Sequence, residues 1–209
     1  MKIIEHESFV NLYNKDQKTF EKLFNNVGTI STLTNRINRL SGIYPVHGYP
    51  DEDKMKGDLF EIFAEIFFKV LSSDNRIGVY NYKPVSSGND NGVDGYGIGM
   101  NNKPLTVQVK FRTDNRTELK ENDLKQFGMQ SIIKYGVDSE TTSNMLVFTN
   151  AAGLHWYTER NVFENRLTAI GYDKIRKLIN GNIVFWKDCL DMVDETIKVR
   201  YEKNDETVA

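Results

Sequence analysis

The stretch Asn91–Phe111, NGVDGYGIGMNNKPLTVQVKF, decides how this chain is organised. Its pattern predicts a β-hairpin with a first strand over Gly95–Met100 and a polar turn at Asn101-Asn102. The returning strand is predicted over Lys103–Phe111, where apolar and polar residues alternate. Because side chains in a strand point to opposite faces in turn, the returning strand should have one apolar and one polar face.

The two faces of the returning strand have different uses. The apolar face should pack on a hydrophobic core and carries Leu105, Val107, Val109 and Phe111. The polar face carries Thr106, Gln108 and Lys110, and Asp94 precedes the first strand of the hairpin. We therefore expect a carboxylate, an amide and an ammonium group to gather at one end of a sheet.

This combination of groups suits a magnesium site. Mg²⁺ binds oxygen ligands and usually keeps several waters, so one or two carboxylates and a neutral carbonyl suffice when a substrate phosphate supplies the rest. A lysine beside such a site can orient or deprotonate the attacking water and offset charge on the phosphate. These groups could therefore hold Mg²⁺ together with a substrate phosphate and position a water beside it.

These residues also resemble a known family. GVDGYG, residues 92–97, followed by QVK, residues 108–110, is similar to the PD-(D/E)xK nuclease superfamily, in the Mrr-like branch where Gln replaces the second acid. The resemblance covers roughly Lys56–Val193 and extends to the nuclease domain at the head of large helicase-nucleases. It implies an α/β fold with a restriction endonuclease-like core, in which helices flank a central mixed β-sheet.

The resemblance also implies the role of each motif residue. Asp94 would ligate Mg²⁺ directly, and Glu61, from the preceding helix, would act through the metal or its waters; Glu65 is the second choice for that glutamate. Gln108 and the carbonyl of Val109 would complete the protein ligands. Lys110 would orient the hydrolytic water for in-line attack, and Mn²⁺ is expected to substitute for Mg²⁺.

Each motif residue also has an ordinary structural explanation. An Asp between glycines is most often a turn residue, and a Lys on an exposed strand face often prevents aggregation. Gln108 could simply cap a neighbouring backbone group. The order of Glu61, Asp94, Gln108 and Lys110, with the correct strand parity, favours the nuclease site over these separate explanations.

Composition excludes several other classes of protein. With 209 residues, 39% of them hydrophobic, the chain should form one or at most two domains. It contains no apolar run of membrane-spanning length and no signal-peptide layout, so we expect a cytoplasmic protein. A lone Cys189 excludes an internal disulfide, and the histidines have no zinc-ligand spacing. The net charge of −2 is not that of a protein that coats nucleic acid.

Helices and strands are predicted to alternate along the chain. Helical patterns begin at Phe9 and continue over Ser31–Leu40, Met55–Leu71, Glu121–Tyr135, Tyr157–Leu167, Tyr172–Ile179 and Trp186–Val193. Further strands are predicted over Ile77–Pro84, Asn144–Asn150 and Asn182–Phe185. We divide the chain into a helical N-terminal extension, residues 1–54, a nuclease domain, residues 55–195, and a flexible tail, residues 196–209.

Several polar residues could contact DNA. Basic residues flank the motif at Lys83, Arg112 and Arg116, and the resemblance suggests Gln130 on the helix after the motif. A later cluster contains Lys174, Arg176 and Lys177. By default each of these is a solvated surface residue.

The sequence therefore favours a Mg²⁺-dependent DNA endonuclease, encoded by a phage or mobile element. A separate helicase or specificity protein, or residues 1–54, would supply translocation or sequence reading. A homodimer would supply the two active sites that cutting both strands commonly needs. Two alternatives remain open: a catalytically inactive DNA-binding or replication accessory module of the same fold, and an inhibitor that contacts another protein through residues 1–50.

Overall fold

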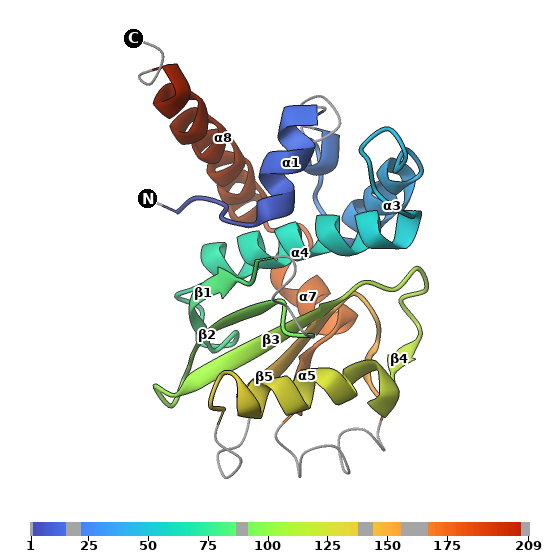
Figure 1. The fold of residues 1–209 in the computed structure, drawn as a ribbon, viewed down its shortest axis with the longest axis vertical. Coiled ribbons are helices and arrows are strands. Elements are labelled where there is room, and N and C mark those ends of the chain that lie inside the picture. Colours follow the sequence, from blue (N-terminus) through green and yellow to red (C-terminus); the bar gives the residue numbers. More distant parts are fainter. Residues whose placement is uncertain (1, 16–21, 87–91, 138–143, 156–166, 206–209) are drawn as a thin grey trace.

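The computed structural model describes residues 2–15, 22–86, 92–137, 144–155 and 167–205. The protein has an α/β fold in which helices lie on both faces of a five-stranded mixed sheet (Figure 1). This architecture confirms the predicted fold class at the level of a mixed sheet flanked by helices. In the described ranges, no helix combines the length and apolar character needed to cross a membrane.

The central sheet has the strand order β1-β2-β3-β5-β7. Its strands are β1 (Val79–Pro84), β2 (Gly95–Gly99), β3 (Pro104–Lys110), β5 (Met145–Thr149) and β7 (Leu167–Ile170). The first three strands pair antiparallel, and β5 and β7 join them in parallel. The predicted hairpin is confirmed as β2 and β3, and the predicted strands in the regions of β1 and β5 are confirmed as well.

Six helices and a small second sheet complete the described elements. The helices are α1 (Glu7–Lys15), α3 (Ile30–Ser41), α4 (Glu52–Val70), α5 (Glu121–Ile133), α7 (Tyr172–Ile179) and α8 (Ile183–Asp205). The second sheet pairs β4 (Glu118–Leu119) with β6 (Gly153–Leu154) in parallel. This short pair was not predicted, because two-residue strands carry no periodic signal.

Helix α4 covers one face of the central sheet. Asp51 caps it by accepting a hydrogen bond of 2.7 Å from the Lys54 amide, so the helix begins three residues before the predicted start. Its phenylalanines surround Phe148 of β5, whose ring centroid lies 4.9–6.0 Å from those of Phe60, Phe63, Phe67 and Phe68. The apolar face of β3 joins the same cluster, as its alternation predicts.

Helix α5 covers the opposite face of the sheet (Figure 1). A second apolar cluster lies there and includes Phe127 of α5 and Val147 of β5. The Thr106 hydroxyl of β3 donates a hydrogen bond of 2.7 Å to the Ser131 hydroxyl of α5. On the polar face of β3, Thr106 and Gln108 are therefore buried on the side that α5 covers, and Lys110 is half-buried.

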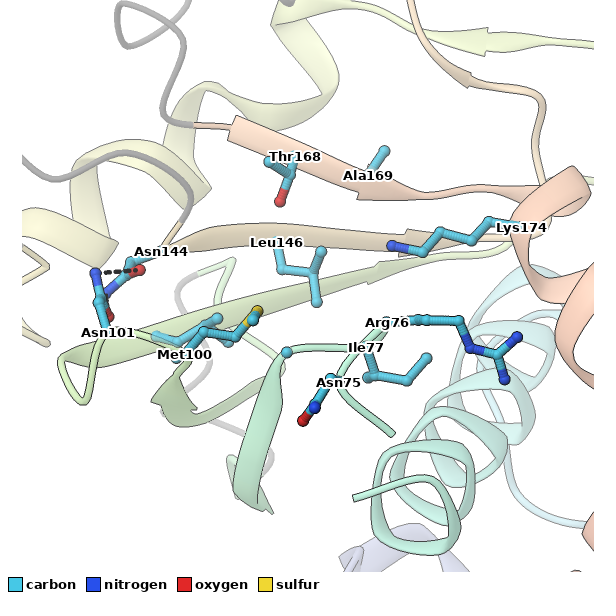
Figure 2. A pocket seen from close by; sticks show the side chains of 13 residues that line it. Asn75, Arg76, Ile77, Met100, Asn101, Asn144, Leu146, Thr168, Ala169 and Lys174 are labelled. Carbon is cyan, nitrogen blue, oxygen red and sulfur yellow. Dashed lines mark hydrogen bonds between the residues drawn. The ribbon is translucent and has the colours of Figure 1, made fainter. Parts of the chain in front are cut away.

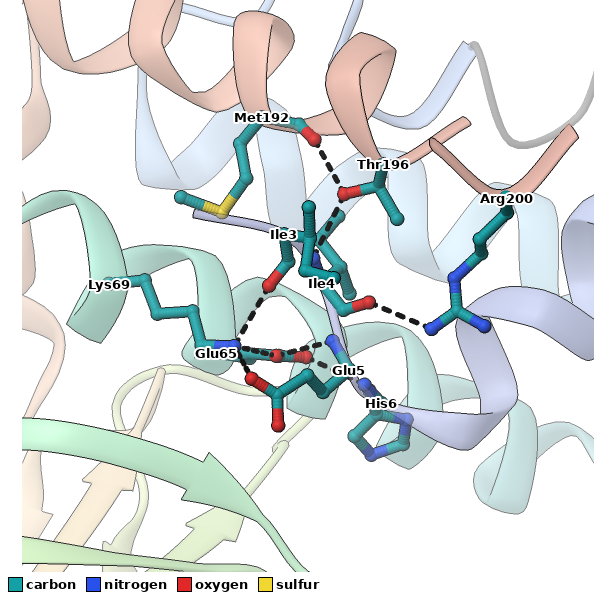
Figure 3. Close-up of polar contacts among 9 residues, drawn as sticks. All are labelled: Ile3, Ile4, Glu5, His6, Glu65, Lys69, Met192, Thr196 and Arg200. Carbon is teal, nitrogen blue, oxygen red and sulfur yellow. Dashed lines mark hydrogen bonds and ion pairs between the residues drawn. The ribbon is translucent and has the colours of Figure 1, made fainter. Parts of the chain in front are cut away.

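The N-terminal segment packs into the same core as α4. Ile4, Phe9 and Leu33 are buried with the α4 phenylalanines in one continuous cluster. Residues 3–6 lie between α4 and α8, as Figure 3 shows. The Ile4 amide donates to the Thr196 hydroxyl at 2.9 Å, so the two ends of the described chain are joined. The helical part of residues 1–54 is thus an integral layer of the protein.

The predicted strand over Asn182–Phe185 is wrong, because α8 begins at Ile183. The Asn182 side chain accepts a hydrogen bond from the Phe185 amide at 3.1 Å and starts the helix. Ile183 and Val184 are 82% and 68% exposed on the first turn. Their β-branched side chains gave the misleading strand signal, and the local cap overrides it.

The C-terminal helix also continues past its predicted end at Val193. It runs to Asp205, so the predicted tail boundary at residue 196 falls inside α8. Thr196 and Arg200 account for the extension, because both bind the backbone of Ile4. The helix predicted over Tyr157–Leu167 lies outside the described residues except for Leu167, which begins β7.

The aromatic cluster should dominate stability. We expect Phe148→Ala to lower the free energy of unfolding by about 3–5 kcal/mol, because a fully buried ring is replaced by a cavity. Urea denaturation would measure the change. Met129→Ala, at a position 53% exposed on α5, is the matched control and should change stability by less than about 0.5 kcal/mol. Equal losses in both variants would contradict the central position of Phe148.

Candidate functional site

Asp94 lies where the pairing of β2 with β3 ends. Its amide donates to the Val107 carbonyl at 3.0 Å, although Val107 already has Gly95 as its register partner. Asp94 and Gly95 therefore both lie opposite Val107, which is the arrangement of a β-bulge. The Asp94 carboxylate accepts a hydrogen bond of 2.6 Å from the Val109 amide. Since the amide and carbonyl of a strand residue point the same way, the Val109 carbonyl is also directed toward Asp94.

Gln108 is adjacent to this contact and is 3% exposed. Its Oε1 atom is buried without a hydrogen-bond partner among the described residues. An unpaired buried carbonyl costs about 1–3 kcal/mol, and a bound water or ion is one explanation for such a group. The predicted alternative, in which Gln108 only caps a neighbouring backbone group, leaves this oxygen unexplained.

Lys110 is half-buried at the end of β3. Its carbonyl accepts a hydrogen bond of 2.7 Å from the Thr149 hydroxyl, which fixes the backbone beside β5. By strand parity its side chain shares the α5-facing side with Gln108. The structure thus brings Asp94, Gln108, Val109 and Lys110 to one end of β3.

Glu61 lies on the side of α4 that holds the N-terminal segment, away from the α5-facing side of the sheet. Its carboxylate is 3.0 Å from Nε2 of His6. Glu65, the second candidate, is fully buried and accepts hydrogen bonds from the amides of Glu5 and His6 and from the Lys69 ammonium. These contacts give Glu65 a structural role and leave Glu61 as the partly exposed carboxylate.

Tyr82 lies within the electrostatic influence of Glu65, Asp94 and Glu61, and the sequence pattern did not single it out. Its ring stacks on Phe68 at 4.8 Å, and its hydroxyl lies against Gly95, where any side chain would collide with it. Burial raises the pKa of Tyr82 well above 10, and the charges of Glu65, Asp94 and Glu61 raise it further. The hydroxyl therefore stays protonated within the electrostatic reach of both predicted acidic ligands, Glu61 and Asp94.

The positions of Tyr82 and His6 could not be predicted from the sequence, for two reasons. A bulge between Tyr80 and Lys83, where Asn81 has a φ of 53°, breaks the alternation that would have placed Tyr82. His6 reaches Glu61 across 55 residues, a separation over which no local pattern operates. Gly95 was the one sequence signal of a close contact, but the sequence does not show that Tyr82 is the residue packed against it.

The donors can be compared with the needs of Mg²⁺. In the described part of the chain, no three His, Cys, Asp or Glu side chains form a group that could hold a metal ion. A set made of one carboxylate, the Gln108 amide oxygen and a main-chain carbonyl fits a hard cation that retains water. The unpaired Gln108 oxygen is the observation that favours this fit.

The predicted DNA-contacting residues occupy different places. Lys83 and Arg116 are exposed, and Lys83 lines a cavity of about 480 Å³ beside Tyr82. Arg112 pairs with Asp123 at 2.9 Å and donates its amide to Asn150. Gln130 is half-buried on α5, and its carbonyl accepts from the Lys134 amide. Of these four residues, Lys83 is the one that lines a cavity together with Tyr82.

Another cavity, of about 350 Å³, lies at the opposite end of the sheet (Figure 2). Lys174 reaches from α7 over Leu146 and Ala169. Burial lowers the pKa of Lys174, and the charge of Asp74 opposes that shift. Asn101 and Asn144 bond each other at 3.2 Å at the other side of the cavity. This cavity is separate from the motif residues, because it is lined by the opposite ends of β2 and β3.

No family model matches this sequence, and a search of curated proteins finds no match. The resemblance to the Mrr-like nucleases therefore rests on the motif residues and their order.

The His6–Glu61 pair should make stability depend on pH. Burial lowers the pKa of His6, but the hydrogen bond and charge of Glu61, aided by Glu65 and Asp58, raise it above 6.5 overall. A raised folded-state pKa gives stability that is complete below about pH 6.5 and is lost as the pH rises through the folded-state value. His6→Gln should flatten this loss when unfolding is measured between about pH 6 and pH 8.5. An unchanged pH profile would show that His6 is not charged in the folded protein.

Proposed function

We propose that this protein is a Mg²⁺-dependent nuclease that hydrolyses phosphodiester bonds in DNA, with a core of the restriction endonuclease type. The observation that carries the proposal is the unpaired, buried Gln108 oxygen, on the residue that precedes Val109, whose amide binds Asp94. Buried polar oxygens in folded proteins normally accept a hydrogen bond or bind an ion. A hydrated divalent cation beside a carboxylate is such a partner.

The motif residues have separate roles in the proposed reaction. Asp94, Gln108 and the Val109 carbonyl would hold Mg²⁺, which supplies charge to polarise the scissile phosphate. Lys110 orients the attacking water and offsets developing negative charge. Glu61 is left out of this set, because His6 holds its carboxylate on the N-terminal side of α4.

The rival function is DNA binding without chemistry. Its support is specific: Gln108 is neutral, Glu61 is already engaged by His6, and the described residues contain no group of three potential metal ligands. A plasmid-relaxation assay with Mg²⁺ or Mn²⁺, with EDTA as the control, separates the two functions. Metal-dependent cleavage supports the nuclease, and DNA binding without cleavage supports the rival.

Lys110→Ala should lower cleavage by about 10²-fold or more, because the attacking water loses its orienting group. Lys187→Ala, at an exposed position on α8, is the matched control and should cleave like the wild type. Both rates would be measured on supercoiled plasmid under the same metal and salt conditions. Cleavage by Lys110→Ala at the wild-type rate would remove Lys110 from the mechanism.

Gln108→Met tests the metal site without relying on activity. The two side chains have similar volumes, and the substitution removes a buried unpaired oxygen, so metal-free stability should stay equal or rise. Mg²⁺ should raise the melting temperature of the wild type and have a smaller effect on the variant. An equal response of both proteins to Mg²⁺ would place the metal elsewhere.

A further inference from the structure

The two outer strands of the sheet present a polar and aromatic face on the α5 side. Across β1 and β2, Tyr80 pairs with Ile98, and Lys83 pairs with Tyr96. Residues directly opposite in an antiparallel pair share a face, so all four side chains point the same way. Tyr82 points the other way, into the core beneath α4.

Helix α5 leaves this face partly uncovered. It packs over β3 and β5 through contacts such as that of Ser131 with Thr106, while Tyr96 and Ile98 remain 40% and 37% exposed. The residues that follow α5 approach the same place: the Tyr135 ring is 5.8 Å from the Tyr96 ring, and the Lys134 ammonium is 5.7 Å from the Tyr135 ring. Two neighbouring tyrosine rings therefore lie on this surface, with Lys83 beside Tyr96 and Lys134 beside Tyr135.

We propose that Lys83, Tyr96, Lys134 and Tyr135 form a platform that binds unpaired bases of a single-stranded DNA segment. Tyrosine rings offer flat apolar faces on which bases stack, and neighbouring lysines attract the phosphates that connect those bases. A protein partner with an apolar surface would not need the two ammonium groups. A fully paired duplex would not expose the faces of its bases.

The position of the platform links it to the motif residues. Tyr96 is two residues after Asp94 in the same strand, a separation of roughly 7 Å. A base stacked on Tyr96 would therefore place an adjoining phosphate near the Asp94 carboxylate. This inference rests on the proposed function for the identity of that phosphate, and it narrows the substrate to DNA with a single-stranded segment at the cleavage point.

Binding can be tested separately from cleavage. Fluorescence anisotropy in EDTA would compare a labelled oligothymidylate with a labelled hairpin duplex of equal charge. Wild type should bind the oligothymidylate more tightly than the duplex. Tyr96→Val keeps the strand preference but removes the ring, and it should weaken oligothymidylate binding about tenfold. Tyr96→Phe keeps the ring and should bind nearly as the wild type does.

Charge and surface controls complete the experiment. Lys83→Ala should weaken binding and reduce the salt dependence by roughly the contribution of one phosphate contact. Lys187→Ala and Ile183→Ala, on exposed positions of α8, should bind normally. Circular dichroism and sedimentation of every variant would show folding and oligomeric state. Equal binding of duplex and oligothymidylate, or normal binding by Tyr96→Val, would overturn the platform. A loss of binding in Tyr96→Val that is accompanied by a changed oligomeric state would overturn it as well.

The two proposals fail in different ways. Tyr96-dependent binding in a protein that cleaves nothing with Mg²⁺ or Mn²⁺ would support the platform and reject the nuclease. Metal-dependent cleavage of duplex DNA that does not respond to Tyr96→Val would support the nuclease and reject the platform.

Discussion

Packing of α4 against the apolar faces of β3 and β5 is the interaction on which the other features depend. The ring of Phe148 lies among four phenylalanines of α4, so the helix is fixed over the middle of the sheet. Once α4 is fixed, its opposite side presents Glu61 and Glu65 to the N-terminal segment. Aromatic burial thereby sets the position of charged groups that would otherwise avoid so enclosed a place.

Much of this architecture could be predicted from local patterns. The alternation in residues 103–111 and the polar turn at Asn101-Asn102 specify the β2–β3 hairpin, and the apolar period of α4 specifies its buried side. The same alternation placed Gln108 and Lys110 on one face of β3. These features are encoded within a few residues of one another, and sequence reasoning is most secure at that range.

The remaining features depend on contacts between distant segments. His6 meets Glu61, Thr196 meets Ile4, and the Tyr82 hydroxyl meets Gly95, and none of these pairs leaves a periodic signal. The start of α8 was misjudged for a different reason, since the strand preference of Ile183 and Val184 was weaker than the cap from Asn182. Burial of the polar face of β3 likewise depends on where α5 docks, which β3 itself does not encode.

The hydrogen bond between Ile4 and Thr196 spans 192 residues, nearly the whole chain. During synthesis Ile4 is added 192 residues before Thr196, so this contact closes only after all the segments between them have been made. Closing so long a loop also makes the contact late and slow relative to the formation of the hairpin. The N-terminal segment that brings His6 to Glu61 is consequently fixed in place after the sheet has formed. Without α8, this segment would lose the hydrogen bonds that Thr196 and Arg200 make to Ile4.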